Sequence, residues 1–391
     1  MSLLESIKQI EKKQCAALGE ELPRLGFGIM RLEKNEDGTV NYENSKKMVD
    51  LAFASGVNYF DTAMPYLDGQ SEAFIGKAFA EYDRSSYFLA DKLPIYYIKE
   101  DGDAERYFAQ QLANCGVEYF DFYLVHSLSD PKRVDPFEQF KLYEFMKQKK
   151  AEGKIRHMGF SFHGNAKTLR YLLDTYPAFE FVQLQINYYD WVDINAKELY
   201  DIVEEYGLPC FVMEPVKGGF LSSFSPRVEQ SMRAHRPDDS LSSWALRWVA
   251  SKPNIALVLS GMTLMEHVQD NLRTFSNLKP IDAQEQVILD EVVSSLQKIN
   301  AVPCTRCSYC MPCPAHVKIP TIFSIYNNYK KTENLAFLKM QYNNKNIMLS
   351  HERAHACIGC RKCMQECPQK IEIPTRMKEI DAAFQALGVV L

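Results

Sequence analysis

Residues 57–93 read VNYFDTAMPYLDGQSEAFIGKAFAEYDRSSYFLADKL, and this stretch decides the fold class. Two short runs rich in apolar and aromatic residues, 57–63 and 87–93, flank a longer amphipathic run at 71–82. Short apolar runs of this kind are typical of buried strands, and the run between them has the length and spacing of a helix. The stretch therefore predicts two parallel strands joined by a crossover helix.

The same unit recurs between residues 24 and 280. Further apolar runs lie at 24–30, 120–126, 155–162, 181–187, 210–215 and 255–261, and further helix-like runs lie at 45–56, 196–207 and 242–253. Eight strand-and-helix units match the size of a closed (β/α)8 barrel, whereas a doubly wound sheet usually has about five or six strands. We therefore predict an α/β protein with a (β/α)8 TIM barrel over residues 1–280.

A barrel of this kind carries its chemistry at the carboxyl ends of the strands, because the loops that follow the strands line that face. Polar side chains stand at the ends of most of the predicted strands. They are Asp61, Lys92, His126, Ser161, His163, Gln183, Asn187 and Glu214. We expect the reactive groups of the barrel to be among these residues.

The eleven cysteines are unevenly distributed along the chain. Three are scattered over the first 300 residues, whereas eight lie between Cys304 and Cys367. Residues 281–300 carry apolar side chains at helical spacing, which predicts a helix that connects the barrel to this part of the chain. We therefore place a second, small and mainly helical domain at residues 301–391.

The second domain contains an internal repeat. CTRCSYCMPCP begins at Cys304 and CIGCRKCMQECP begins at Cys357, and both segments continue with similar residues. Three cysteines spaced by two residues, with a fourth before proline, are typical of two-cluster ferredoxins, in which that fourth cysteine binds the other cluster. The pattern predicts two [4Fe–4S] clusters, one on Cys304, Cys307, Cys310 and Cys367 and the other on Cys357, Cys360, Cys363 and Cys313.

Zinc is the alternative metal, since paired CxxC motifs also form tetrahedral zinc sites. The third cysteine of each triplet and the Cys-Pro pair exceed what a zinc ribbon needs, so the pattern favours iron–sulfur clusters. Residues 301–391 contain twelve Lys plus Arg against six Asp plus Glu, so this part of the chain is basic. The surplus can offset the negative clusters, or it can form a docking surface for an acidic electron-transfer protein.

The whole chain has a formal charge of -5 and a pI near 6.0. This balance gives no reason to expect nucleic acid or an anionic membrane as a partner. The first residues, MSLLESIKQIEKKQ, mix charge into every turn, unlike a secretory signal, and the longest apolar runs are the size of strands. We therefore predict a cytoplasmic protein with no nucleic-acid or membrane partner.

Asp61 and Lys92 suit one particular reaction. Hydride transfer from a nicotinamide to a carbonyl needs a proton donor beside the developing alkoxide. A tyrosine has a reference pKa of about 10, and a nearby ammonium lowers that value by stabilising the tyrosinate. Lys92 can supply the ammonium, held in place by an ion pair with Asp61.

The residues around these positions resemble the tetrad motifs of the aldo/keto reductases. The motifs are GVNYFDTAMPY at 56–66, LADK at 89–92 and DFYLVH at 121–126. The similarity continues in LGFGIMRL at 25–32, GFSFHG at 159–164, FVQLQIN at 181–187 and LSGMTLMEHVQDNL at 259–272. With its cysteine-rich end, the chain resembles the subgroup of aldo/keto reductases that is fused to a ferredoxin-like domain.

The resemblance implies an oxidoreductase that uses NADP or NAD on a small-molecule carbonyl substrate. Tyr66 would be the general acid, tuned by Lys92 and Asp61, and His126 would orient the substrate. The nucleotide would contact a set of residues at the strand ends and in the loops. These are Gly28, Met30, Ser161, Phe162, Gln183, Met213, Lys217, Gly261, Asp270 and Asn271.

Three features depart from the family pattern. Most members have asparagine at the position of Phe162, and an aromatic residue that stacks on the nicotinamide at the position of Met213. Between Gly261 and Asn271 there is no Lys or Arg to pair with the 2′-phosphate of NADP, which weakens the case for NADP over NAD. Lys217 is the nearest alternative cation.

Two other functions stay open from the sequence. A hydride carries two electrons whereas each cluster passes one, so exchange between them needs a converter such as flavin. The sequence contains no motif that we would assign to a flavin. One alternative is an electron-transfer protein that links a ferredoxin-type partner to a two-electron cofactor. The other is a redox-responsive binding protein with a vestigial reductase site.

Overall fold

The computed structural model describes residues 9–299, 301–344 and 347–389. The chain splits into two compact units. The first comprises Met1–Pro215 and Ala245–Ile281, and the second comprises Val216–Trp244 and Asp282–Leu391. The predicted domain boundaries, at residues 280 and 300, stay a prediction.

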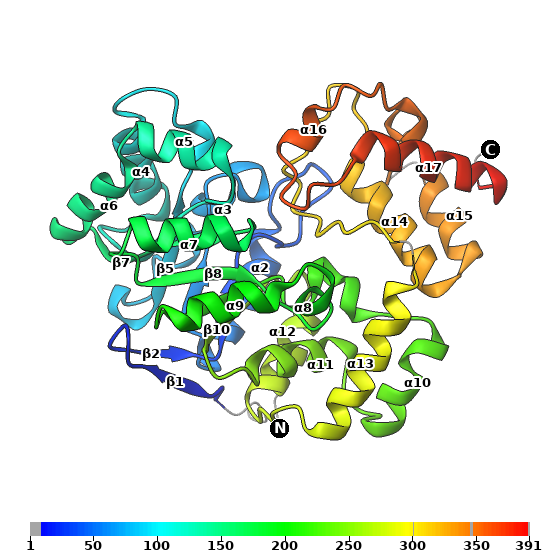
Figure 1. The fold of residues 1–391 in the computed structure, drawn as a ribbon, viewed down its shortest axis with the longest axis horizontal. Helices are drawn as coiled ribbons and strands as arrows, with labels where there is room; N and C mark the ends of the chain where they lie inside the picture. Colours follow the sequence, from blue (N-terminus) through cyan, green and yellow to red (C-terminus); the bar gives the residue numbers. More distant parts are fainter. Residues whose placement is uncertain (1–8, 300, 345–346, 390–391) are drawn as a thin grey trace. The chain divides into compact units, whose positions relative to one another are not determined.

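Eight parallel strands close into a barrel in the first unit (Figure 1). In chain order they are β3 (Leu25–Gly28), β4 (Tyr59–Asp61), β5 (Phe88–Leu93), β6 (Phe120–Val125), β7 (Ile155–Phe162), β8 (Phe181–Gln185), β9 (Cys210–Met213) and β10 (Ile255–Ser260). The last strand pairs with the first, Leu259 lying opposite Gly26, and this pairing completes the ring. Each strand lies within one of the eight predicted apolar runs, so the barrel prediction is confirmed.

Aromatic side chains fill part of the barrel interior. Tyr59, Phe122, Phe181 and Phe211 are fully buried, and the contacting rings among them lie 4.6–5.7 Å apart between centroids. An antiparallel hairpin of β1 (Lys12–Cys15) and β2 (Glu20–Pro23) precedes the barrel, and its Leu22 packs into the same cluster. The interior is therefore a packed core, as barrels of this class require.

Helices of the first unit follow the strands. They are α2 (Tyr42–Ala54), α3 (Ser71–Ala78), α4 (Asp103–Cys115), α5 (Pro131–Gln139), α6 (Leu142–Ala151), α7 (Ala166–Thr175), α8 (Asp190–Asp193), α9 (Ala196–Glu205), α11 (Leu241–Ala250), which begins in the second unit, and α12 (Met265–Phe275). Short 3-10 turns are η1 (Tyr66–Gly69), η2 (Arg84–Ser86) and η3 (Ile95–Tyr97). η1 and η3 follow β4 and β5, so they stand at the carboxyl ends of those strands.

The second unit is mainly helical, as predicted. It contains α10 (Pro226–His235), α13 (Ala283–Gln297), α14 (Ile319–Thr332), α15 (Leu335–Asn343), α16 (Lys362–Gln365), α17 (Ile373–Ala386), and the 3-10 turns η4 (Lys217–Ser222), η5 (Ser350–Glu352) and η6 (Ala354–Ala356). Phe323, Tyr342, Met377 and Phe384 are among the buried residues of its core. Within the parts of the chain that the structure describes, no helix combines the length and the apolar character needed to cross a membrane.

The internal repeat is visible in the helices of the second unit. α14 begins with Ile319 and Pro320, and α17 begins with Ile373 and Pro374, each directly after a cysteine motif. Proline suits the first turn of a helix because its missing N–H would have no partner there. The two halves of the repeat therefore fold alike: a cysteine-rich loop followed by a helix that packs into the common core.

Candidate active site

The four residues of the predicted tetrad stand at the ends of three neighbouring strands. Asp61 is the last residue of β4, Lys92 lies in the last two residues of β5, and His126 directly follows β6. Tyr66 begins η1, five residues after Asp61. Because β4, β5 and β6 are adjacent in the barrel, these side chains converge at its carboxyl end.

Lys92 and Asp61 form a buried ion pair. Lys92 Nζ lies 2.6 Å from Asp61 Oδ1 and donates a second hydrogen bond to the carbonyl oxygen of Thr62 at 2.8 Å. Burial alone would lower the pKa of Lys92, but the negative charge of Asp61 and its hydrogen bond to the lysine outweigh the burial and raise it. The lysine therefore remains an ammonium, and its Nζ lies 4.8 Å from the centroid of the Tyr66 ring.

His126 meets the ring of Tyr66 edge to face. The two ring centroids are 5.8 Å apart and the rings are inclined at 86°. Burial, followed by the positive charges of Lys92, His163 and Arg133, holds the pKa of His126 well below its usual value. The imidazole is therefore neutral near pH 7, so it can hydrogen-bond to a carbonyl oxygen without adding a charge.

A polar network behind Lys92 was not expected from the sequence. Gln111 Nε2 donates hydrogen bonds to the carbonyl oxygen of Lys92 at 2.9 Å, to Asp91 Oδ1 at 3.0 Å and to Glu72 Oε1 at 3.3 Å. Asp91 Oδ1 also accepts from the backbone N–H of Lys92 at 2.7 Å. Burial and the nearby Glu72 raise the pKa of Asp91 well above its usual range. The network fixes the backbone on both sides of the lysine.

The residues predicted to hold the nicotinamide carboxamide lie side by side. Ser161 and Gln183 face each other in the register of β7 and β8, and both are buried. Ser161 Oγ accepts a hydrogen bond from the backbone N–H of Ser127 at 2.8 Å. Gln183 Oε1 is a buried acceptor that has no hydrogen-bond partner within the described residues. A carboxamide N–H would satisfy it, so this pair fits the group.

Phe162 and Met213 occupy the positions where the sequence departs from the family. The Phe162 side chain is buried against Phe160, with ring centroids 6.1 Å apart. It also closes on Gly164, where an added Cβ would lie 2.6 Å from the Phe162 ring. Met213 ends β9 and is half-buried. Position 162 therefore offers no side-chain amide to a ligand.

Arg31 is a residue that the sequence analysis did not select. Its guanidinium forms a 3.1 Å ion pair with Glu214, and its Cδ would lie 3.0 Å from a Cβ added at Gly261. Arg31 comes three residues after β3, Glu214 follows β9 and Gly261 follows β10. The pair therefore brings a cation to the ends of these strands, close to the turn where the sequence between Gly261 and Asn271 supplies none.

The remaining predicted nucleotide residues lie on separate elements. Gly28 ends β3, and Met30, two residues later, is half-buried. Asn271 of α12 is buried and its side-chain amide donates to Ser260 Oγ at 2.9 Å. Asp270, on the same helix, pairs with Arg273 at 3.5 Å. Lys217 belongs to the second unit, and its role stays a prediction.

Four cysteines of the second unit line one cavity. They are Cys304, Cys307, Cys310 and Cys367, the set predicted for the first cluster. Apolar residues complete the walls, among them Ile319, Phe323 and Ile371. None of the described cysteines of the second unit forms a disulfide. Four thiols around an apolar cavity are a donor set that suits an iron–sulfur cluster.

The other four cysteines also lie close together. Burial, and after it the charges of Cys357, Cys313 and Cys360, raise the pKa of the Cys363 thiol to about 11. These four are the set predicted for the second cluster, including Cys313 from the first half of the repeat. Cys360 is exposed, unlike the half-buried cysteines of the other set. The second thiol set is therefore more open to solvent than the first.

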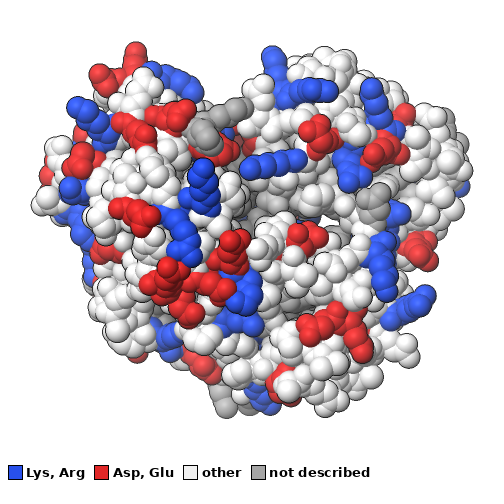
Figure 2. Space-filling view, viewed as in Figure 1, with Lys and Arg blue, Asp and Glu red and all other residues white. Residues whose placement is uncertain are grey.

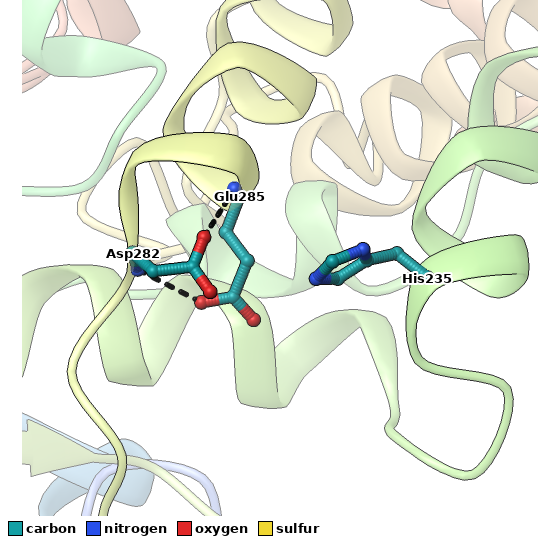
Figure 3. A group of neighbouring side chains, drawn as sticks. All are labelled: His235, Asp282 and Glu285. Carbon is teal, nitrogen blue, oxygen red and sulfur yellow. Dashed lines mark hydrogen bonds between the residues drawn. The ribbon is translucent and has the colours of Figure 1, made fainter.

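His235, Asp282 and Glu285 form a further group of possible metal ligands (Figure 3), with ligand atoms within 4.8 Å of one another. Asp282 and Glu285 make a capping box at the start of α13, each accepting the other's backbone N–H at 2.8 and 3.0 Å. Glu285 also pairs with Arg236. Because both carboxylates already satisfy the helix end and a guanidinium, we assign this group to helix capping.

Two family models match the chain. The first, described as "Aldo/keto reductase family", matches residues 24–294. The second, described as "4Fe-4S dicluster domain", matches residues 303–372. This second match agrees with the prediction of two [4Fe–4S] clusters and disfavours the zinc alternative.

Several relatives match over most of their own length. An NADH-specific methylglyoxal reductase from Escherichia coli is 25% identical over 323 residues, covering 71% of this chain and 96% of that protein. An L-galactose dehydrogenase from Arabidopsis thaliana is 25% identical over 312 residues, covering 75% and 96%. Both alignments cover more than two thirds of the present chain, so the similarity includes most of the barrel.

Solved structures share the fold. An aldo-keto reductase from Bacillus halodurans in its holo form gives a TM-score of 0.57 at 22% identity, covering 73% of this chain and 96% of that chain. An aldo/keto reductase from Klebsiella pneumoniae in complex with NADP and acetate gives a TM-score of 0.57 at 19% identity, covering 70% and 93%. At this level of identity the likeness concerns the fold alone.

Proposed function

The chain belongs to the aldo/keto reductase family, and from this premise we propose that it reduces a small-molecule aldehyde or ketone with Tyr66 as general acid. The resemblance noted in the sequence is thereby confirmed at the level of the family. The chain is an NAD(P)-dependent oxidoreductase that also carries a 4Fe–4S dicluster domain.

The arrangement of Lys92, Asp61, Tyr66 and His126 carries this proposal. The Tyr66 hydroxyl donates its proton to the carbonyl oxygen as negative charge develops there. The Lys92 ammonium, 4.8 Å from the Tyr66 ring, stabilises the tyrosinate that remains. His126, neutral and 5.8 Å from the same ring, orients the carbonyl through a hydrogen bond. Bound NADPH or NADH supplies the hydride that the carbonyl carbon accepts.

Residues of the barrel and its loops would hold the nucleotide. Ser161 and Gln183 would bind the carboxamide, since Gln183 Oε1 is a buried acceptor without a hydrogen-bond partner among the described residues. Met213 would pack against the nicotinamide ring through its polarizable thioether. Arg31 would pair with phosphate oxygens, and Asp270 and Asn271 would contact the adenine end, whereas the role of Lys217 stays the one predicted from the sequence. The backbone at Gly28, Met30, Phe162 and Gly261 would line the remaining path.

The eight cysteines of the second unit would hold two [4Fe–4S] clusters, with Cys313 and Cys367 each crossing to the other half of the repeat. When bound, such clusters pass one electron at a time. A second candidate function, favoured by the match to a dicluster domain, is electron exchange with a protein partner. The two functions are compatible, because they use different parts of the chain.

Substitution of Tyr66 tests the proposal. We expect Tyr66→Phe to lower kcat for aldehyde reduction by about 10²- to 10⁴-fold, because the general acid is lost while the ring remains. Fluorescence titration with NADPH and NADH should show little change in nucleotide affinity. Tyr97→Phe is the matched control, because Tyr97 lies in η3, at the carboxyl end of the neighbouring strand β5, but is 43% exposed. An unchanged rate in Tyr66→Phe would remove this residue from the role of general acid.

A further inference from the structure

The cysteine loops of the two repeat halves differ in how far they are covered. In the first half, the residue after the first cysteine is Thr305, which is 3% exposed. Gly218 approaches this residue so closely that an added Cβ would lie 2.4 Å from the Thr305 carbonyl oxygen. The corresponding residue of the second half is Ile358, which is 70% exposed. The second half therefore presents an apolar side chain to solvent at the position where the first half is buried.

Residues 358–362 form a continuous exposed segment, which we call the exposed loop. A Cβ added at Gly359 would meet no described atom within 4 Å. Cys360 is exposed, whereas its counterpart in the first half, Cys307, is half-buried. The loop leads directly into α16 (Figure 1). The part of the predicted second cluster that Cys360 binds is therefore within reach of another protein.

The exposed loop is positively charged. Arg361 and Lys362 carry its two charges, and neither side chain forms an ion pair with another described residue. Residues 353–365 contain no Asp or Glu. Two clusters would carry about -4 against the surplus of six positive charges in residues 301–391, so the net charge of this part of the chain stays positive. Because exposed charges steer the encounter and select the partner, the loop favours an acidic protein.

A surface of this size suits a transient electron-transfer complex. Such complexes bury less than about 1,200 Å² in total, whereas stable complexes bury about 1,200–2,000 Å². The centre of an interface is apolar and its rim is polar. Ile358 supplies an apolar centre beside the exposed Cys360, and Arg361 and Lys362 supply a charged rim. A small protein that docks here would bring its redox centre close to a ligand of the second cluster.

On the basis of the proposed electron exchange, we propose that the exposed loop is the docking surface for a small acidic protein that carries one electron, and that this electron enters the chain through the second cluster. The reduced carrier loses one electron, and the oxidised cluster on Cys357, Cys360, Cys363 and Cys313 gains it. No bond is formed or broken and no proton moves. The first cluster is not the entry point, because its loop is covered at Thr305.

Binding of an acidic ferredoxin tests the docking surface. A plant-type ferredoxin is titrated by calorimetry into anaerobically purified protein with both clusters, at about 20 and about 300 mM NaCl. Lys362→Glu should weaken binding by about 10-fold at low salt and by less at high salt, because salt screens exposed charges. Ile358→Ser should weaken binding by about 5-fold at both salt concentrations, since salt does not screen an apolar contact. Lys339→Glu and Met340→Ser make the same changes at exposed residues of α15 and should bind like wild type.

Small charged oxidants test the surface without a protein partner. Protein reduced with dithionite is mixed with anionic Fe(III)-EDTA or with cationic tris(phenanthroline)cobalt(III), and the cluster absorbance is followed by stopped flow. Lys362→Glu should lower the ratio of the anionic to the cationic rate by about 5-fold, because it reverses a charge beside the second cluster. Lys339→Glu should leave this ratio unchanged. An equal change in both variants would contradict electron entry at the exposed loop.

The two repeat halves supply matched variants for the route of the electron. Cys307→Ser removes a ligand of the first cluster and leaves the second in place, so reduced ferredoxin should reduce it within about 3-fold of the wild-type rate. Cys360→Ser leaves only the first cluster, and its reduction should be slower by about 10-fold or more. The reverse order of the two rates would overturn the assignment of the second cluster as the entry point.

The remaining outcomes separate the docking surface from the function on which it rests. Absence of ferredoxin binding to the wild type, or equal weakening in Lys362→Glu and Lys339→Glu, would overturn the inference. A dimer that Ile358→Ser dissociates, measured by analytical ultracentrifugation, would assign the loop to a second copy of the chain and would also overturn it. Binding that depends on Ile358 and Lys362 but reduces no cluster would support the docking surface and count against the proposed electron exchange.

Discussion

At the scale of single residues, the proposed site depends on two buried bases, of which one is a cation and the other is neutral. The side chains of Lys92 and His126 are almost completely buried. Asp61 supplies the negative charge that keeps Lys92 protonated, whereas positive charges near His126 add to the effect of burial. The barrel therefore offers a cation to the proton donor and a neutral imidazole to the substrate.

The neutral state of His126 makes stability depend on pH. The pKa of His126 is depressed in the folded state, so its contribution is fully present above the unfolded value of about 6.5 and is lost as pH falls toward the folded value. Between about pH 6.5 and 5.5, wild type should lose roughly 1 kcal/mol more stability than His126→Gln. Urea unfolding followed by tryptophan fluorescence at both pH values measures the difference. Parallel losses in the two proteins would contradict a buried neutral imidazole.

Which site residues can be predicted from sequence follows from how they are positioned. Asp61, Lys92 and His126 each stand at a strand end, so the pattern of apolar runs is enough to select them. Arg31 and Glu214 meet across 183 positions of the chain, and nothing local to either residue indicates the other. Gln111 likewise contacts Lys92 from α4, a helix that the sequence analysis did not single out. The network behind Lys92 is therefore visible only in three dimensions.

At the scale of elements, the eight barrel strands are predictable because parallel strands buried on both faces read as continuous apolar runs. The hairpin of β1 and β2 is not, since its strands read KKQC and EELP and show little apolar character. The unit to which residues 216–244 belong is likewise not predictable from the sequence. They lie between two barrel strands in sequence, yet they belong to the second unit. Their attachment comes from contacts with α13 and with residues after 300, which no local pattern reveals.

Gly218 is one of these attachments. It adopts a φ of +61°, and an added Cβ would lie 2.4 Å from the carbonyl oxygen of Thr305, the residue after Cys304. On the same segment, Lys331 of α14 donates to the carbonyl oxygen of Phe220 at 2.8 Å. The segment that leaves the seventh barrel strand is therefore held against the cysteine-rich part of the chain.

Replacing Gly218 should release this segment. We expect Gly218→Ala to push the backbone away from Thr305 and to speed tryptic cleavage after Lys217 by about 10-fold, since local opening exposes the bond. Gly219→Ala is the matched control: its φ of +89° imposes similar strain, but the nearest atom to the added Cβ is 3.8 Å away. Mass spectrometry of the early fragments measures both rates. Equal cleavage in the two variants would mean that the Thr305 contact does not hold the segment.

The assignment of the cluster ligands predicts how the iron content changes when one cysteine is replaced. Cys360→Ser should lower the iron content from about eight to about four atoms per chain, because it removes one thiolate of the second set. Cys15→Ser, which changes a buried cysteine of the first unit, should leave the iron unchanged. Iron and sulfide are quantified on protein purified without oxygen. Retention of about eight irons in Cys360→Ser would contradict the proposed ligand assignment.

At the scale of the whole molecule, the chain combines a two-electron barrel with one-electron clusters. A hydride carries two electrons whereas each cluster passes one, so direct exchange between the two is inefficient. We therefore expect the barrel to reduce its substrate without a change in the redox state of the clusters. The clusters would then serve a protein partner or the structure of the second unit.

The charge of the second unit fits the presence of clusters. Residues 301–391 have a surplus of six positive charges, and each oxidised cluster with four thiolates carries a net charge of about -2. Figure 2 shows Lys and Arg side chains spread over the region that α16 and α17 occupy in Figure 1. Two such clusters would together carry about -4, so they can balance most of the surplus and leave a modest positive charge.

A single-turnover experiment under anaerobic conditions decides whether the barrel is a self-contained reductase. Protein with both clusters is mixed with one equivalent of NADPH and an excess of aldehyde, while the nicotinamide and cluster absorbances are recorded together. We predict that the nicotinamide is oxidised, that one equivalent of alcohol forms and that the cluster absorbance stays constant. Oxidation of NADPH that bleaches the clusters and yields no alcohol would contradict direct hydride transfer in the barrel.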